Sequence, residues 1–166
     1  MTESKFEKYV TRKPAVLMGS GPDGPDFRVP DTDTLPIWNE ENTGPRVIFS
    51  NDLVKEENAV IEYGFITGDT MMGDGRNIGT HRHEYPEVFC FLGTRPNDTT
   101  YLGAEVEFWM GEGDDMEKLI FTTSSSVYVP ANVVHFPMYW RNVTEPNMMV
   151  VVIPQVEKVR PVSVKR

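Results

Sequence analysis

The segment THRHEYPEVFCFLG, residues 80–93, decides both the fold and the candidate site of this chain. In it a single residue separates His81 from His83, and Glu87 follows at the start of an apolar run. Alternate side chains of a β-strand point to one face, so both imidazoles are expected to project to the same side. After the break at the intervening proline, Glu87 and Phe89 are expected to return to the inward face.

The residue pattern from position 46 onward predicts an antiparallel all-β protein. Short runs rich in β-branched and aromatic residues alternate with Gly, Asp and Asn, and many short strands at this spacing are typical of a sandwich or barrel. The expected strands cover residues 46–49, 59–67, 80–83, 88–92, 104–110, 118–122, 126–129, 135–140 and 148–153.

Two connections between these runs bear on the site. The residues of 111–115 (GEGDD) tolerate positive φ, so the strands on either side are expected to pair. The longer segment 93–103 is expected to be either a decorative loop or a rim element over a binding site.

The length of 166 residues favours a single domain. Residues 1–45 are rich in Pro and Gly yet carry apolar side chains, which predicts an extended arm that packs on the barrel or on a partner subunit. The barrel is expected over residues 46–157. Residues 158–166 form a short basic tail.

Charge and composition exclude several classes of partner. A net charge of -9 argues against nucleic-acid binding, which needs clustered Lys and Arg. The chain shows neither an apolar leader nor a run long enough to span a bilayer, and Cys90 has no second cysteine to pair with. We therefore expect a cytoplasmic protein without a membrane partner.

His135, the third of only three histidines, completes a candidate metal site with His81, His83 and Glu87. Three imidazoles and one carboxylate suit one divalent transition metal, Fe, Mn, Ni, Co or Zn, rather than Ca or Mg. Four protein ligands leave two positions of an octahedron open, as a catalytic metal requires. The alternative is a barrel without metal, although burying these groups without an ion would be costly.

The residues Gly75, His81, His83 and Glu87 match the spacing G-x5-H-x-H-x3-E, which resembles the first motif of the cupin superfamily. The second motif, P-x-G-x2-H-x3-N, is similar to Pro130, Asn132, His135 and Tyr139, with Asn132 in place of glycine and Tyr139 in place of asparagine. Asn visits the left-handed region more readily than most residues. The resemblance, over residues 59–153, implies a cupin jelly-roll (double-stranded β-helix) barrel that pairs as a homodimer.

Further site residues follow from position. Tyr139 lies four residues after His135, so a regular strand would aim its phenol at the metal as a proton carrier, and Arg141 would continue that face toward a substrate. Tyr85 is expected at the mouth of the site. Phe89 is expected either to bind substrate or to pack.

These features favour a metal-dependent cupin enzyme that acts on a small oxygen-rich molecule, a diol, enol or carboxylate. A dioxygenase-type oxidoreductase is the leading hypothesis, with Tyr139 and Glu87 as catalytic residues. A non-redox lyase or isomerase would use the same ligands, and a non-catalytic small-molecule-binding barrel is the third hypothesis, because this fold hosts all three.

Overall fold

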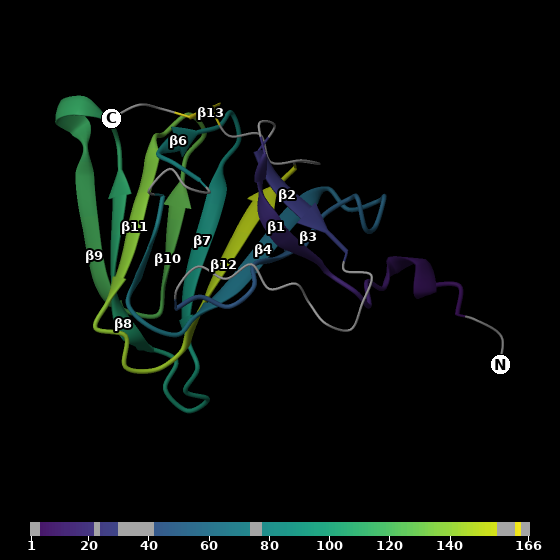
Figure 1. Cartoon of the computed structure of the whole chain (residues 1–166), viewed down its shortest axis with the longest axis horizontal. Helices are drawn as coiled ribbons and strands as arrows, with labels where there is room; N and C mark the ends of the chain where they lie inside the picture. Colours follow the sequence, from purple (N-terminus) through teal and green to yellow (C-terminus); the bar gives the residue numbers. More distant parts are fainter. Residues whose placement is uncertain (1–3, 22–23, 30–41, 74–77, 156–161, 164–166) are drawn as a thin grey trace.

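Two antiparallel sheets form the molecule in the computed structural model, which describes residues 4–21, 24–29, 42–73, 78–155 and 162–163 (Figure 1). Within these residues a seven-stranded sheet has the order β10-β7-β12-β4-β3-β1-β2, and a six-stranded sheet has the order β13-β6-β11-β8-β9 with β5 beside β11. Two short 3-10 helices, η1 (Glu7–Tyr9) and η2 (Gly113–Asp115), accompany them. The strands are β1 (Ala15–Gly21), β2 (Gly24–Arg28), β3 (Val47–Phe49), β4 (Ala59–Ile66), β5 (Thr70–Met72), β6 (His81–Arg82), β7 (Glu87–Gly93), β8 (Tyr101–Met110), β9 (Glu117–Thr123), β10 (Ser125–Val129), β11 (His135–Arg141), β12 (Asn147–Pro154) and β13 (Val162–Ser163).

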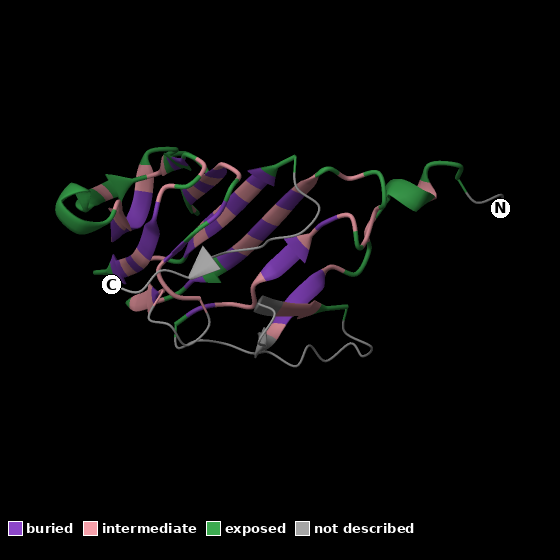
Figure 2. Ribbon diagram, turned by 90° about the horizontal axis from the view of Figure 1, so that it is seen from above, coloured by how far each residue is buried: buried purple, intermediate pink, exposed green. Residues whose placement is uncertain are grey.

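The core lies between the two sheets. Burial alternates along β4, β7 and β12, so one face of each strand is inside and the other faces outward (Figure 2). In β7 the prediction is confirmed, since Glu87, Phe89 and Phe91 are buried while the residues between them are more exposed. The interior is largely aromatic and aliphatic, with Phe89, Phe91, Phe108, Met138, Trp140 and Val151 among its members.

Every predicted strand overlaps an observed one, which confirms the all-β prediction. The first 45 residues differ from the expectation in part. Within the segment predicted to be an extended arm, residues 15–28 form the β1–β2 hairpin, and β1 pairs with β3 so that the hairpin extends the larger sheet. The apolar residues 35–38 and most of the basic tail lie outside the described residues. Of that tail, the two residues of β13 pair with β6.

The two connections singled out in the sequence have different places. Strands β8 and β9 pair across residues 111–116, as predicted. The connection 94–100 follows the end of β7, roughly 20 Å along that strand from Glu87. Arg95 lies over the ring of Tyr101 and pairs with Glu145, so this loop packs against the turn before β12 rather than over the histidines.

Strand β11 contains an irregularity that matters for the site. Its register with β8 shifts between His135 and Met138, and Phe136 within the shift has a φ of +73°. Gly73, with a φ of +94°, lies directly beside it: a Cβ there would be 2.9 Å from the Cβ of Phe136 and 3.0 Å from the Cα of Pro137. This glycine therefore allows the bulge to pack.

Gly73→Ala is expected to destabilise the protein by about 2 to 3 kcal/mol, because the left-handed backbone penalty adds to a clash with the Cβ of Phe136 and the Cα of Pro137. Gly113→Ala is the matched control, since its φ is +57° and no described atom lies within 4 Å of the added Cβ. The control should lose only about 1 kcal/mol. Urea unfolding of both variants measures the difference, and equal losses would contradict the packing role of Gly73.

Among the residues described, no helix is long and apolar enough to cross a membrane.

Candidate metal centre

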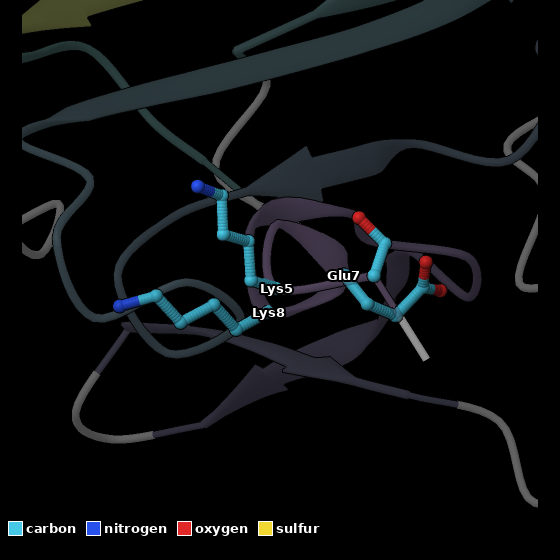
Figure 3. A pocket seen from close by; sticks show the side chains of 4 residues that line it. Lys5, Glu7 and Lys8 are labelled. Carbon is cyan, nitrogen blue, oxygen red and sulfur yellow. The ribbon is translucent and has the colours of Figure 1, made fainter. Parts of the chain in front are cut away.

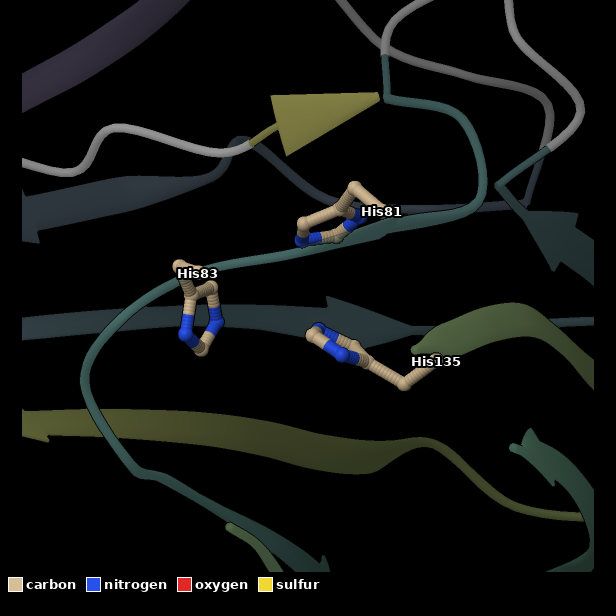
Figure 4. Close-up of side chains that lie close together, drawn as sticks. All are labelled: His81, His83 and His135. Carbon is tan, nitrogen blue, oxygen red and sulfur yellow. The ribbon is translucent and has the colours of Figure 1, made fainter. Parts of the chain in front are cut away.

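Three buried histidines lie close together (Figure 4), at the end of the barrel where β6 lies (Figure 1). One ligand nitrogen of each of His81, His83 and His135 lies within 4.8 Å of those of the other two. Glu87 completes the group: its Oε2 is 3.0 Å from Nε2 of His83 and 3.3 Å from Nε2 of His135. The structure thus brings together the three predicted histidine ligands and places Glu87 beside two of them. Gly75 of the first motif lies outside the described residues.

The backbone places each ligand at, or directly after, the end of a strand. His81 opens β6 and is the cross-strand partner of His135, which opens β11. His83 follows β6 on the same face, and Arg82 between the two histidines is exposed, as the strand alternation predicted. Asn132 has a φ of +66°, and its N–H donates to the carbonyl of His83 at 2.7 Å. An asparagine thus serves at the turn where the motif has glycine.

Hydrogen bonds fix the orientation of all three rings. Nδ1–H of His81 donates to the Gly79 carbonyl at 2.8 Å, that of His83 to the Tyr85 carbonyl at 2.6 Å, and that of His135 to the Val133 carbonyl at 3.1 Å. A neutral imidazole that donates from Nδ1 carries its lone pair on Nε2. These Nε2 lone pairs therefore face the interior of the cluster.

This arrangement requires a cation. The Nε2 of His83 and of His135 face the Glu87 carboxylate, and a lone pair and a carboxylate are both acceptors. In addition, Nε2 of His135 is buried and has no hydrogen-bond partner among the described residues. Buried polar atoms are rarely left in this way. A proton or a metal ion between the rings and the carboxylate would separate the facing acceptors and would give Nε2 of His135 a partner. The residues therefore fit a metal.

The electrostatics favour the forms that bind metal. Burial, together with the nearby His135, lowers the pKa of His81 to about 4, so its imidazole is neutral at pH 7. Burial by itself would raise the pKa of Glu87, but hydrogen bonds from His135 and His83, with a proton on their Nε2 atoms, outweigh it and lower the pKa to about 2. The site thus presents an uncharged imidazole and an ionised carboxylate, as metal ligation requires.

The lowered pKa of His81 predicts how acid affects the metal-free protein. Between pH 6.5 and pH 4, His81 is protonated in the unfolded chain but stays neutral in the folded protein. Stability is therefore full above pH 6.5 and falls by up to about 3 kcal/mol as the pH approaches 4. The stabilising effect of Glu87 persists through this window and is lost only as the pH falls from 4.5 toward 2. Urea unfolding after EDTA treatment measures this dependence, and His81→Gln should flatten it; the same slope in the variant would contradict the assignment.

Tyr139 and Arg141 are not where the sequence placed them. The register shift between His135 and Met138 reverses the alternation, so Met138 and Trp140 enter the core instead. Tyr139 is half-buried on the outer face, and the guanidinium of Arg141 lies 4.8 Å from the centre of its ring. The prediction that these two side chains share the inward face of His135 is wrong. Pro137 within the strand is the signal that could have indicated the bulge.

The remaining candidates have clear places. The ring of Tyr85 stacks on the imidazole of His83, with centroids 4.2 Å apart and planes 8° apart, so it borders the site. Phe89 is 1% exposed in the core, and its ring centroid is 6.0 Å from that of His135, which fits packing.

Sequence reasoning missed a buried charged pair, Arg46 and Glu62. Glu62 is 5% exposed and accepts a hydrogen bond from Nη2 of Arg46. In the sequence, the face of strand 59–66 that carries Ile61 and Tyr63 is the more apolar one, so Glu62 would be placed outside. The structure has the opposite orientation. Hydrophobic alternation in this strand carried no signal that could have found Glu62.

A separate concavity lies beside η1, away from the histidines (Figure 3). It has a volume of about 390 Å³ and is lined by Ser4, Lys5, Glu7 and Lys8. These side chains lie at the surface of the amino-terminal segment and offer none of the predicted ligands.

Comparisons with known proteins bear on the fold. No family model matches the chain, and no curated protein matches it in sequence. Among solved structures, oxalate decarboxylase from Bacillus subtilis is similar with a TM-score of 0.51 at 13% identity, over 76% of this chain and 28% of that one. Vicilin from hazelnut (Corylus avellana) has a TM-score of 0.51 at 11% identity, over 75% and 32%. A cupin-2 domain protein from Rhodospirillum rubrum has a TM-score of 0.49 at 13% identity, over 86% and 82%.

The chain thus spans about a third or less of the oxalate decarboxylase and vicilin chains. At such low identity the likeness concerns the fold alone, and it agrees with the two facing antiparallel sheets. The chain has the cupin barrel fold.

Proposed function

We propose that this protein is a metal-dependent enzyme that acts on a small oxygen-rich molecule, with dioxygenase-type oxidation as its reaction. One observation carries the proposal: three buried imidazoles, each oriented by a backbone carbonyl, direct Nε2 atoms toward one another and toward an ionised carboxylate. Preformed ligands of this kind are typical of a metal site, and hydrogen-bond partners that fix the tautomer of each ring strengthen metal binding.

His81, His83, His135 and Glu87 would hold one divalent Fe, Mn, Ni, Co or Zn ion. Such an ion, when bound, supplies Lewis acidity and, for the redox-active metals, electron transfer. The chain itself excludes water from the ligands, which are 0 to 6% exposed. Tyr85, stacked on His83, keeps that ring in place. Tyr139 has no part in the proposal, because its side chain lies on the other face.

The test begins with elemental analysis of the protein purified without a polyhistidine tag. The wild-type protein should contain about one equivalent of metal, and Glu87→Ala should lose most of it. Glu84→Ala is the matched control, because Glu84 is exposed three residues before Glu87 and should leave the metal content unchanged.

Oxygen uptake with catechols and enols then separates the reactions. Uptake by an Fe, Mn or Ni protein supports a dioxygenase. A protein that holds only Zn and consumes no oxygen would instead be assigned to the lyase and isomerase class. A wild-type protein without metal would overturn the proposal and leave a non-catalytic binding barrel.

A further inference from the structure

A buried ion pair lies on the inner face of the larger sheet. Arg46, just before β3, donates from Nη2 to Oε2 of Glu62 in β4, and the two side chains are 17% and 6% exposed. Ile48, the cross-strand partner of Glu62, belongs to the core cluster, which places Glu62 on the inner face. Gly64 lies beside the pair, since a Cβ there would be in ordinary van der Waals contact with Cγ of Arg46, at 3.5 Å.

The pair belongs to the same interior as the histidine site. Glu62 is in register with Val151 of β12, which is in register with Phe89 of β7, and the Phe89 ring lies beside His135. Strand spacing and rise place the Cα atoms of Glu62 and Glu87 roughly 12 Å apart, with both side chains pointing inward. The charges interact: burial raises the pKa of Glu62, Arg46 opposes this, and Glu87 raises the pKa further.

Stability does not explain the pair. Replacing a buried ion pair by apolar residues of similar volume is often neutral or stabilising, so such a pair is weak evidence for a structural role. It is also incompletely bonded, because Nε of Arg46 is buried and has no hydrogen-bond partner in the part of the chain that the structure describes. A buried N–H without a partner is costly, so its retention needs an explanation, and a bound group that accepts from it would supply one.

The chemistry of the pair selects its ligand. Arg46 offers a free N–H donor, and Glu62 beside it offers an acceptor. A hydroxyl group can accept from the first and donate to the second. A carboxylate would only accept and would be repelled by Glu62, whereas an ammonium group would only donate and would be repelled by Arg46.

We propose that Arg46 and Glu62 bind a hydroxyl group of the substrate, one distinct from the oxygens that reach the histidine site. The free Nε–H of Arg46 donates to the hydroxyl oxygen, and the hydroxyl donates to Glu62. This inference rests on the proposed function, since it takes the molecule bound at the histidines as its starting point, and it narrows the substrate to a polyhydroxylated one.

Competing phenols provide the test. Catechol has only the two hydroxyls that chelate a metal, whereas pyrogallol and hydroxyquinol each carry a third. Calorimetric titration under nitrogen of the metal-loaded wild-type protein should show at least one of the triols binding about tenfold more tightly than catechol, as a charge-assisted hydrogen bond allows.

The double variant Arg46→Met/Glu62→Leu should keep its metal and its affinity for catechol but lose the preference for the triol. Glu62→Gln, which keeps the shape but accepts a hydrogen bond without a charge, should reduce the preference about fivefold, and it carries the test if the double variant does not fold. Ile48→Val, beside Glu62, is the control and should keep the full preference.

A wild-type protein that holds metal but shows no triol preference overturns this inference. So does a preference that persists in the double variant or in Glu62→Gln. Absence of metal from the wild-type protein would instead refute the proposed function, so elemental analysis of each sample distinguishes the two failures.

Discussion

His83→Ala is expected to lower the metal content of the purified protein more than tenfold. The substitution removes one of three converging imidazoles and leaves the Glu87 carboxylate, which lies 3.0 Å from His83, without that partner. Removing even a group that only hydrogen-bonds to a metal ligand typically costs 10- to 100-fold in metal affinity, so loss of a ligand should cost at least as much. Elemental analysis measures the metal directly.

The same variant should lose its stabilisation by added metal. A ligand at 100 times its Kd stabilises the folded state by about 2.7 kcal/mol, so wild-type Tm should rise with added metal and that of His83→Ala should not. Arg82→Ala is the matched control, because Arg82 lies between the two histidines and points outward. Unchanged metal content in His83→Ala would refute the ligand assignment.

Phe89→Ala is expected to destabilise the protein by about 3 to 5 kcal/mol. The Phe89 ring is 1% exposed and lies within 5.8 Å, centroid to centroid, of both Phe108 and Phe136, so its removal opens a cavity in the middle of the core. Phe65→Ala is the control: Phe65 is 42% exposed and should lose less than about 1 kcal/mol.

Chemical denaturation of metal-free protein separates this packing role from substrate binding. If Phe89 only contacted substrate, Phe89→Ala would unfold at the wild-type midpoint in the absence of substrate. Such a result would contradict the assignment of Phe89 to the core.

The sequence predicted those parts of the molecule where local pattern and tertiary structure agree. In β7, strict alternation placed Glu87 and Phe89 inside, and the histidines separated by one residue shared a face, because a regular strand has a period of two. The ligand set needed only these two strands and the third histidine, His135.

The errors occurred where the period of two fails or gives no signal. Tyr139 was assigned to the face of His135 by counting residues, but the bulge adds a residue and reverses every side chain after it. Glu62 was missed because the apolar face of β4 is turned outward, where Tyr63 stacks on Phe49. A strand at residues 15–21 was missed because glycines in the segment weaken its strand pattern, although pairing with β3 stabilises it.

The separation of Glu87 from the connection 94–100 by the length of β7 has a practical consequence for protein engineering. Residues 94–100 are exposed, and the loop lies at the end of the barrel away from the histidines. A fluorescent label or an affinity handle attached at Asn97 would therefore report on the protein without adding competing ligands near the site. The same loop is the natural position for immobilising the protein on a surface with the histidine end facing the solution.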